Sequence, residues 1–468
     1  MDPPFDNTRH IRYWQRCLRS LLPHQYTSND STRMTLGCFI VAAIDLLLPP
    51  GSPSIISPTD KQKLRDWVLA CQHPCGGFAG GPTHAHSSSE YDGFDFITGQ
   101  PVAGTHSAAN LAATLFALQL LALLSDDTDI NEGVAAESAF IGVNRAATLS
   151  WLSQLQRKDG SFGEVLVDVV DLEAPDGRRL VIAGGSDTRY CYIASMIRWM
   201  LRGQTQKGDG EWVKDIDVDA LVRYIRKGQT YDGGFSESSM HESHAGYAFC
   251  AIAALSLLDR PQEKASKTSS DIFDRDIPDK PAFIHWLASR QVLPSSPCSQ
   301  DEDEVEDEVQ GTAESEEVAA IAQPAGGHPR YIGFNGRSNK PADTCYTWWT
   351  MGTLANLHQG TIDDREVIEP SRRFLLEKMQ HVIGGFSKCP GGPPDLYHSY
   401  LGLAALATMG EPSLKSFDPV LCISSDTVKK IEVARQRLLS GAGKYGQERR
   451  QSYLDMGKAC WENATSIR

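Results

Sequence analysis

The sequence lacks any apolar run of the roughly 18 residues that a membrane-spanning helix needs. The longest candidate, around residues 111–124, is interrupted by Thr114 and Gln119. The first residues, MDPPFDNTRHIRYW, contain no apolar core of a secretory signal, and the final SIR is not a lipidation signal. These absences predict a cytoplasmic protein that is not embedded in a membrane.

The sequence also lacks the cysteine pattern of a disulfide framework. Its 11 cysteines are scattered singly, mostly in apolar, helix-like stretches such as those around Cys38, Cys191 and Cys250. This distribution favours reduced thiols in a cytosolic protein over a disulfide framework.

An overall excess of basic residues is lacking as well. The formal net charge is −14, and residues 301–317 alone carry ten acids and no base, which leaves about −4 for the rest of the chain. Nothing in this distribution indicates nucleic-acid binding. The acidic tract has too little apolar content to pack, so we expect it to lie in a disordered surface loop.

A repeat becomes visible when the glutamines are aligned. In each copy of the repeat, an aromatic residue is followed by a glutamine and then by a turn that contains glycine and phenylalanine. The phenylalanine lies six residues after the glutamine in four copies, and 43 residues after it in the remaining copy. The longer copy therefore carries an insertion of about 37 residues, at about 294–328, which includes the acidic tract. The aromatic/glutamine pairs are Trp67/Gln72, Trp151/Gln156, Tyr224/Gln229, Trp286/Gln291 and the looser Phe374/Gln380.

Each turn is followed by a segment rich in alanine, leucine and other small or aliphatic residues. The first of these reads THSAANLAATLFALQLLALL from residue 105, and Thr35–Leu48 looks like part of a further hairpin. Such segments favour buried helices. Hairpins of one amphipathic and one apolar helix bury both faces by closing into a ring. We therefore predict an all-α fold, an α/α barrel of helical hairpins at 31–420, with an N-terminal extension at 1–30 and a C-terminal helical tail at 421–468.

Polar residues gather where the predicted inner helices begin, just after the glycine turns. His106, Asp187, Arg189 and His244 all occupy this level, as do Asp343, Cys345 and His398. Helix N-termini are the electropositive ends, so this mouth of the barrel is suited to hold an anion.

A metal site is predicted from the register of two neighbouring repeats. Cys345 lies 11 residues after Phe334, and His398 lies 12 after Phe386, so both fall at the same depth. With Asp343 they supply the thiolate, imidazole and carboxylate ligands of a catalytic zinc site. The alternatives are a helix N-cap followed by a buried thiol, and a hydrogen-bonded core histidine.

Cations flank this predicted metal site. Arg337 and Lys340 precede a helix start and suit a diphosphate, although ordinary surface charge also explains each of them alone. Aromatic and small residues on the inner helices line a deep apolar pocket or simply pack the core; they are Tyr192, Tyr247, Phe249, Cys250, Trp348 and Trp349.

Several segments resemble those of a known family. GRSNKPADTCYTWW, ESHAGYAFC, DLYHSYLGLAAL and DTRYCYIAS are similar to segments of protein prenyltransferase beta subunits, in the same order and on the same repeat. The similarity covers most of residues 30–410. It is strongest to the geranylgeranyl-transferring type I enzymes.

The resemblance implies a function. A 20-carbon geranylgeranyl group would pass from its diphosphate to the cysteine thiol of C-terminal CaaX motifs, on small GTPases of the Rho and Rap type, through a zinc-bound thiolate. The implied partner is an alpha subunit shared with farnesyltransferase. The implied zinc ligands are Asp343, Cys345 and His398; the diphosphate contacts are His244, Arg337, Lys340, Tyr346 and Lys388; the isoprenoid contacts are Thr35, Phe39, Arg189, Tyr192, Ala245, Gly246, Cys250, Trp348 and Trp349; the peptide contacts are Asn110, Ala112 and Tyr397.

Two positions bear on the subtype. Thr35 aligns with a tryptophan of the farnesyl-transferring relatives, and its smaller side chain lengthens the pocket by about one isoprene unit. Lys388 aligns with a magnesium-binding aspartate of those relatives, so we predict that magnesium is not required. Asn110 stands where the family has a peptide-reading histidine, and Tyr397 is closer to the farnesyl type.

Other classes remain as alternatives. One is a farnesyltransferase beta subunit, and another is a non-catalytic helical scaffold. A terpene-cyclase-like barrel would need an acidic proton-donor motif on an inner helix, and the apolar helices contain none.

Overall fold

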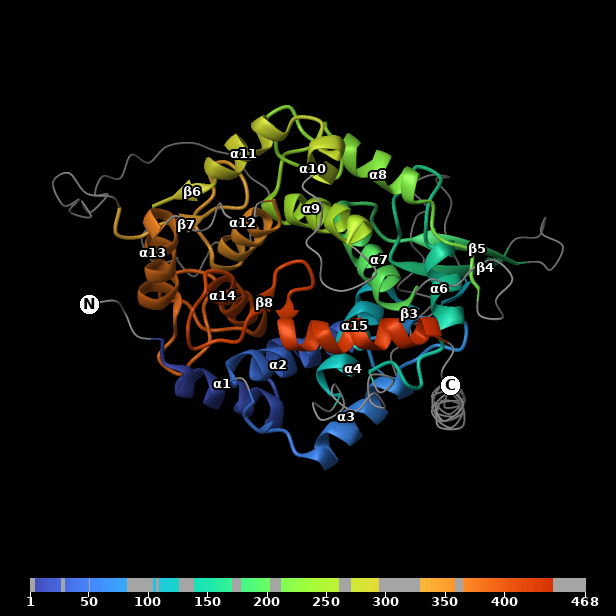
Figure 1. Ribbon diagram of the computed structural model, residues 1–468, viewed down its shortest axis with the longest axis horizontal. Coiled ribbons are helices and arrows are strands. Elements are labelled where there is room, and N and C mark those ends of the chain that lie inside the picture. The colour runs from blue at the N-terminus through green and yellow to red at the C-terminus, as the bar shows by residue number, and fades with distance from the viewer. Residues whose placement is uncertain are drawn as a thin grey trace.

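The computed structural model describes residues 5–26, 30–49, 51–81, 104–106, 109–125, 139–170, 178–202, 212–260, 271–293, 329–357 and 365–440. Within this part of the chain, helices form two concentric rings (Figure 1). The inner ring is closed, because each inner helix packs on the next one along the chain and the last packs on the first. Its members are α2 (Arg33–Leu47), α4 (Leu111–Leu123), α7 (Thr188–Leu201), α9 (Ala245–Asp259), α12 (Thr344–Leu357) and α14 (Leu396–Thr408).

The outer ring surrounds these helices and covers their outward faces (Figure 1). The prediction of an α/α barrel is confirmed. The outer members are α1 (Asn7–Arg19), α3 (Pro58–Ala70), α6 (Arg145–Gln154), α8 (Val218–Lys227), α10 (Asp271–Asp276) with α11 (Lys280–Ala288), and α13 (Arg365–Arg373), which continues into the π-helix η4 (Phe374–Met379).

The glutamine and phenylalanine of each repeat pair with each other across the turn. Isolated antiparallel bridges join Gln72 to Phe78, and the equivalent residues of three further repeats. In the interrupted repeat, Gln291 of β6 (Gln291–Val292) pairs with Phe334 of β7 (Gly333–Phe334). The two sides of the insertion therefore belong to one repeat unit, as the spacing predicts; residues 294–328 themselves lie outside the described part.

The repeated glutamine also fixes the next outer helix. Gln156 donates to the carbonyl of Asp217 at 2.9 Å and accepts from its backbone N–H at 2.7 Å. Asp217 is the N-cap of α8. Gln229 makes the same pair of hydrogen bonds to Asp279, the N-cap of α11. The repeated glutamine thus satisfies backbone groups that would otherwise remain unpaired at the starts of α8 and α11.

His10 of α1 contacts the glutamine of the last repeat and so closes the outer ring. The Nε2 atom of His10 lies 3.0 Å from the side-chain oxygen of Gln380, and its Nδ1 accepts from Gly385 N–H at 3.2 Å. The ring of His10 is fully buried between Phe5 and Phe386, with centroids 4.8 and 4.9 Å away. Residues assigned to an N-terminal extension therefore contribute a helix to the barrel.

Low pH is expected to lower the stability that His10 contributes to the folded protein. Burial lowers the pKa of His10 to about 4, so the unfolded chain binds a proton between pH 6.5 and 4 that the folded chain does not. Stability contributed by this group therefore falls as the pH falls through that window, by about 2 kcal/mol between pH 7.5 and 5.0.

Urea unfolding of the wild type and of His10→Gln at the two pH values tests this expectation. Glutamine keeps one donor and one acceptor but does not titrate, so its pH-dependent loss should be smaller by about 2 kcal/mol. An equal loss in the two proteins would contradict the assignment.

One end of the barrel is closed by the segment at 420–422. Tyr192, Gln119 and Tyr400, from three inner helices, donate to the three consecutive carbonyls of this segment at 2.6, 2.7 and 2.6 Å. Leu421 at its centre is fully buried. These hydrogen bonds anchor the segment to three inner helices, and we call it the floor.

Helix α15 (Ser425–Ser440) lies across the same end, against α4 and α7 (Figure 1). Lys430 donates to the carbonyl of Ser125 just beyond α4 at 2.9 Å, and Ile431 is fully buried. The first part of the predicted C-terminal tail is thus packed on the barrel, whereas residues 441–468 lie outside the described part.

Strands are few and short. β2 (Gly104–His106), β4 (Val165–Val170) and β5 (Arg178–Ala183) form an antiparallel sheet beside the ring. His106 therefore belongs to a strand, and the helix predicted from residue 105 begins only at Leu111. Two-residue pairs join β1 (Phe78–Ala79) to β3 (Ala109–Asn110) and β8 (Phe417–Asp418) to β9 (Ile423–Ser424).

Two other expectations can be compared with the described residues. No helix there is long and apolar enough to cross a membrane. Eight of the described cysteines have free thiols, as expected of a reduced protein, whereas Cys389 is disulfide-bonded, which departs from that expectation.

Candidate active site

The N-terminal ends of α12 and α14 bring the predicted metal ligands together at the end of the barrel opposite the floor. Cys345 is in the first turn of α12, and its N–H donates to the Asp343 carboxylate at 2.5 Å. The Asp343 backbone is itself held by the carbonyl of Phe334 at 3.2 Å. The glycine-phenylalanine turn therefore fixes where the first two ligands lie.

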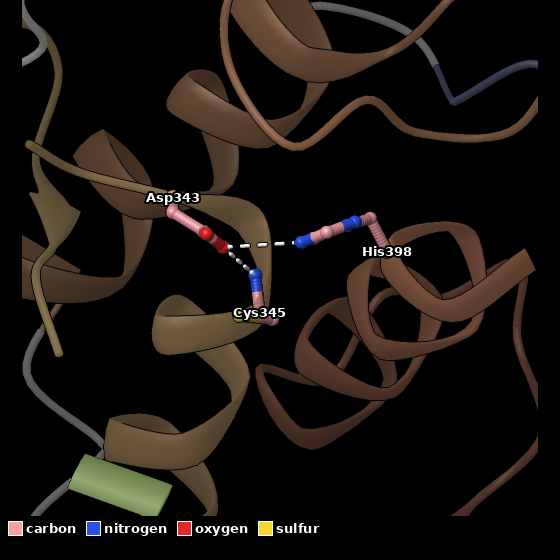
Figure 2. Close-up of side chains that lie close together, drawn as sticks. All are labelled: Asp343, Cys345 and His398. Atoms are coloured by element: carbon pink, nitrogen blue, oxygen red, sulfur yellow. Dashed lines mark hydrogen bonds and ion pairs between the residues drawn. The ribbon is translucent and has the colours of Figure 1, made fainter. Parts of the chain in front are cut away.

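The third ligand, His398, belongs to α14 of the next helical hairpin. One potential ligand atom each of Asp343, Cys345 and His398 lies within 4.8 Å of the others. The Nε2 atom of His398 is 3.7 Å from an Asp343 oxygen, and Figure 2 shows the side chains converging from α12 and α14. Asp343 and Cys345 are buried, at 7% and 6% exposure. The predicted convergence of these three residues is what the structure shows.

Asp395 orients the histidine and was not singled out in the sequence. Its carboxylate lies 2.6 Å from Nδ1 of His398, and it also caps α14 by accepting from the His398 N–H at 2.8 Å. This contact leaves Nε2 directed at Asp343, as in many metal sites where an outer carboxylate fixes the ligand imidazole. The signal in the sequence is an aspartate three residues before the histidine at a helix start.

The electrostatics of the cluster suit a cation. Burial opposes the charged form of His398, but its interactions with Asp343 and Asp395 outweigh burial and raise its pKa to about 9. Burial, together with the neighbouring Asp343 carboxylate, raises the pKa of the Cys345 thiol well above its ordinary value. A divalent cation would relieve both effects, and carboxylate, thiolate and imidazole are the ligands that zinc accepts. The residues present therefore fit a zinc ion.

His244 and Tyr346 form the core of the predicted diphosphate site. His244 caps α9 by accepting from Gly246 N–H on Nδ1 at 3.0 Å, so its Nε2 carries the proton and donates to the Tyr346 hydroxyl at 3.2 Å. Burial and the cations Arg337 and Arg189 lower the pKa of His244 to about 4. The histidine is therefore a neutral donor, and it leaves the tyrosine proton available to an anion.

The predicted cations lie around this pair. The carbonyl of Gly336 accepts from the first N–H of α9 at 2.9 Å, which brings Arg337 and Lys340 to the start of that helix. Arg337 is half-buried and lies 3.4 Å from Glu242, and Lys340 is exposed. The backbone carbonyl of Lys388 accepts from Thr344 N–H at 3.2 Å, so this exposed lysine lies beside the base of α12.

Aromatic side chains from the inner helices lie below this mouth. Trp349 remains partly exposed on α12 and packs on Phe249 with ring centroids 5.0 Å apart. Across the ring, Phe39 is partly exposed and stacks on Tyr400 at 4.9 Å. The Trp349 indole donates to the Tyr397 hydroxyl at 3.3 Å and so links the two groups.

Other predicted lipid contacts differ in accessibility. Thr35 in the first turn of α2 is partly exposed, and Arg189 is exposed beside Asp187 at 2.7 Å. Five are buried, so they form part of the packed walls rather than a free surface; they are Tyr192, Ala245, Gly246, Cys250 and Trp348. Trp348, whose exposure is 0%, packs on Phe417.

One predicted peptide contact has a different role. Asn110 is 3% exposed, and its side-chain oxygen accepts from Ala113 N–H at 2.7 Å as the N-cap of α4. Because this side chain is buried and used for capping, the structure argues against the prediction that it contacts a peptide. Ala112 is partly exposed, and Tyr397 is 39% exposed beside His398.

Two closed rings of helices, with a polar mouth at one end and a floor at the other, define an α/α toroid. The family model of the prenyltransferase alpha-alpha toroid domain matches residues 5–423. The chain belongs to this family.

Individual relatives agree with this assignment. The geranylgeranyl transferase type-1 subunit beta of Arabidopsis thaliana is 27% identical over 427 residues, which are 89% of this chain and 88% of that protein. The protein farnesyltransferase subunit beta of Pyricularia oryzae is 25% identical over 87% of this chain and 63% of that protein. The solved structure of Candida albicans protein geranylgeranyltransferase-I complexed with GGPP matches with a TM-score of 0.61 and 25% identity, over 92% of this chain and 99% of that one.

Proposed function

We propose that this chain is the catalytic beta subunit of a type I protein geranylgeranyltransferase. It would transfer a 20-carbon group from its diphosphate to the cysteine of a CaaX motif on small GTPases. The observation that carries the proposal is the juxtaposition of the Asp343, Cys345 and His398 cluster with the His244–Tyr346 pair at one mouth, above accessible aromatic side chains.

Each part of the mouth has a chemical task. When bound by Asp343, Cys345 and His398, zinc would lower the pKa of a substrate thiol, which is otherwise about 8.5. The hydroxyl of Tyr346 and the charges of Arg337, Lys340 and Lys388 would stabilise the leaving diphosphate as its negative charge grows. The partly exposed aromatic groups of Phe39, Phe116 and Trp349 would shield the isoprenoid from water, and the buried Phe249 supports Trp349 from behind.

Two residues support the geranylgeranyl subtype. Thr35, in the first turn of α2, has a smaller side chain than the tryptophan with which it aligns in farnesyl-transferring relatives. Lys388 lies beside the base of α12 and aligns with the magnesium-binding aspartate of those relatives. Tyr397 favours the second candidate, a farnesyltransferase beta subunit. We further propose a cytoplasmic heterodimer with a helical alpha subunit, one zinc per beta subunit and no magnesium requirement.

A donor competition assay tests the subtype. With the 15- and 20-carbon diphosphates mixed, and CaaX peptides ending in Leu, Phe and Met, the heterodimer should prefer the longer donor and keep that preference when magnesium is chelated. Burying the five extra carbons of the longer donor contributes up to ~4 kcal/mol of binding free energy, at ~0.8 kcal/mol per methylene, before the entropic cost of ordering the lipid is subtracted. Thr35→Trp should therefore shift the ratio of kcat/KM values toward the shorter donor by about 100-fold. A wild type that prefers the 15-carbon donor, or a variant with unchanged preference, would refute the proposed subtype.

A further inference from the structure

A buried arginine packs against the loop that carries Arg337 and Lys340. Arg290 follows α11 and is only 5% exposed. Its Nε and Nη1 atoms have no hydrogen-bond partner in the described part of the chain. Its Nη2 atom donates to the hydroxyls of Ser289 at 3.1 Å and Ser338 at 3.4 Å. Most of the hydrogen-bonding capacity of this guanidinium is therefore unused.

Arg290 holds this loop at two points. Its backbone carbonyl accepts from the N–H of Asn335, where the loop begins, at 3.0 Å, and its side chain reaches Ser338 at the centre of the loop. The loop is also closed on itself, because the side-chain nitrogen of Asn335 donates to the carbonyl of Lys340 at 3.1 Å. The positions of Arg337 and Lys340 therefore depend on Arg290.

The same guanidinium is connected to the segment that carries His244. It lies over the indole ring of Trp286, with its Cζ atom 4.9 Å from the ring centre. The Trp286 indole donates to the Ser243 hydroxyl at 2.8 Å, and Ser243 directly precedes His244, the N-cap of α9. One buried cation thus contacts the supports of both elements that form the candidate diphosphate site.

The charge of Arg290 is not balanced by the acids around it. Burial lowers the pKa of Arg290, and the charges of Asp232 and Glu242 offset burial only in part. Both acids have other partners, since Asp232 accepts from the Ser243 hydroxyl at 2.6 Å and Glu242 lies 3.4 Å from Arg337. Among the described residues, no carboxylate forms an ion pair with Arg290. A buried charge without such a partner is costly, and a nearby anion would offset that cost.

We propose that Arg290 is a positioning residue of the diphosphate site, and that its buried charge is balanced only when a diphosphate binds at the mouth. This inference rests on the function proposed above. A buried cation attracts an anion over several ångströms, because the protein interior and the lack of salt around it screen the charge weakly. Arg290 therefore adds to the attraction of Arg337 and Lys340 and holds their loop in place, without touching the donor itself.

Arg435 offers a matched control at the closed end of the barrel. It is 6% exposed, its Nε atom also has no hydrogen-bond partner among the described residues, and its Cζ atom lies 4.0 Å from the ring centre of Trp199. It belongs to α15, which lies across the end opposite the mouth. Replacing Arg435 therefore removes a comparably buried arginine stacked on a tryptophan, away from the diphosphate site.

The test is binding of inorganic diphosphate and of the 20-carbon donor to the chain prepared with the proposed alpha subunit, measured by titration calorimetry. Two neutral variants, Arg290→Gln and Arg290→Met, should each raise the Kd of both ligands by about 10-fold or more. Geranylgeraniol has the same lipid chain without the charges, so its Kd should stay within about twofold of the wild-type value. Arg290→Lys keeps the charge and should raise the Kd of the charged ligands by only about threefold. Arg435→Met should change each Kd by less than about twofold.

Equal losses of affinity for the donor and for geranylgeraniol would show that Arg290 only supports the packing of the mouth, and would overturn the inference. An unchanged Kd for diphosphate in the neutral variants would do the same, as would a lysine variant as weak as the methionine variant or an equal loss in Arg435→Met. In each of these cases the proposed function would stand. A wild type that binds neither inorganic diphosphate nor the donor would contradict the proposed function, and this inference with it.

Discussion

Cys345→Ala is expected to reduce transfer to a CaaX cysteine by at least about 1,000-fold. The variant removes one of three converging ligand side chains, and a metal held by the remaining two would activate the substrate thiol poorly. Binding of the lipid diphosphate should be nearly unchanged, because His244 and Tyr346 are held by their own contacts. Single-turnover transfer and donor binding, measured in parallel, separate the two effects.

Cys75→Ser is the matched control for this variant. Cys75 is an exposed, free thiol in a glycine turn and is not one of the three converging ligands, so its loss should leave transfer within about twofold of the wild type. Wild-type rates in Cys345→Ala would show that the thiol is not needed. An equal loss of donor binding would indicate that the substitution disturbs the whole mouth.

Arg337→Ala combined with Lys340→Ala is expected to lower kcat/KM by about 100-fold or more. Each charge-assisted hydrogen bond to the departing diphosphate contributes roughly 1.5–3 kcal/mol, which is about 10- to 150-fold in rate. The loss should appear in the chemical step, because the charge on the diphosphate grows as the carbon–oxygen bond breaks. Rapid-quench kinetics with saturating donor measure that step.

An exposed pair on the outer ring provides the control for charge itself. Arg226→Ala with Lys227→Ala removes the same charges from the end of α8. That variant should change kcat/KM by less than twofold, and by a similar factor at low and high salt. A comparable loss of kcat/KM in both double variants would show that Arg337 and Lys340 act only through the net charge of the protein and not through contacts with the diphosphate.

The ring and the metal ligands followed from the sequence because the repeat has a fixed register. Six residues separate Gln from Phe in the intact copies, and the structure shows that this distance is set by a backbone bridge. Since the bridge fixes where each inner helix begins, counting from the phenylalanine placed His398 level with Cys345. The insertion did not disturb the count, because Gln291 and Phe334 still pair.

Other features of the fold and site could not be located by counting along the repeat. The His10 contact with Gln380 joins the two ends of the ring, 370 residues apart, and no periodicity relates them. The floor at 420–422 is held through backbone carbonyls, which any residue supplies. Asn110 was named a peptide contact because it stands where the family has a histidine, and its burial and its role as the N-cap of α4 could not be read from that position.

Metal analysis of the purified chain, prepared with the alpha subunit proposed above, tests the central claim most directly. Elemental analysis after gel filtration in metal-free buffer should give about one zinc per chain for the wild type and for Cys75→Ser, and almost none for Cys345→Ala. Less than about half a zinc in the wild type, or a zinc content that Cys345→Ala leaves unchanged, would contradict a catalytic metal at Asp343, Cys345 and His398.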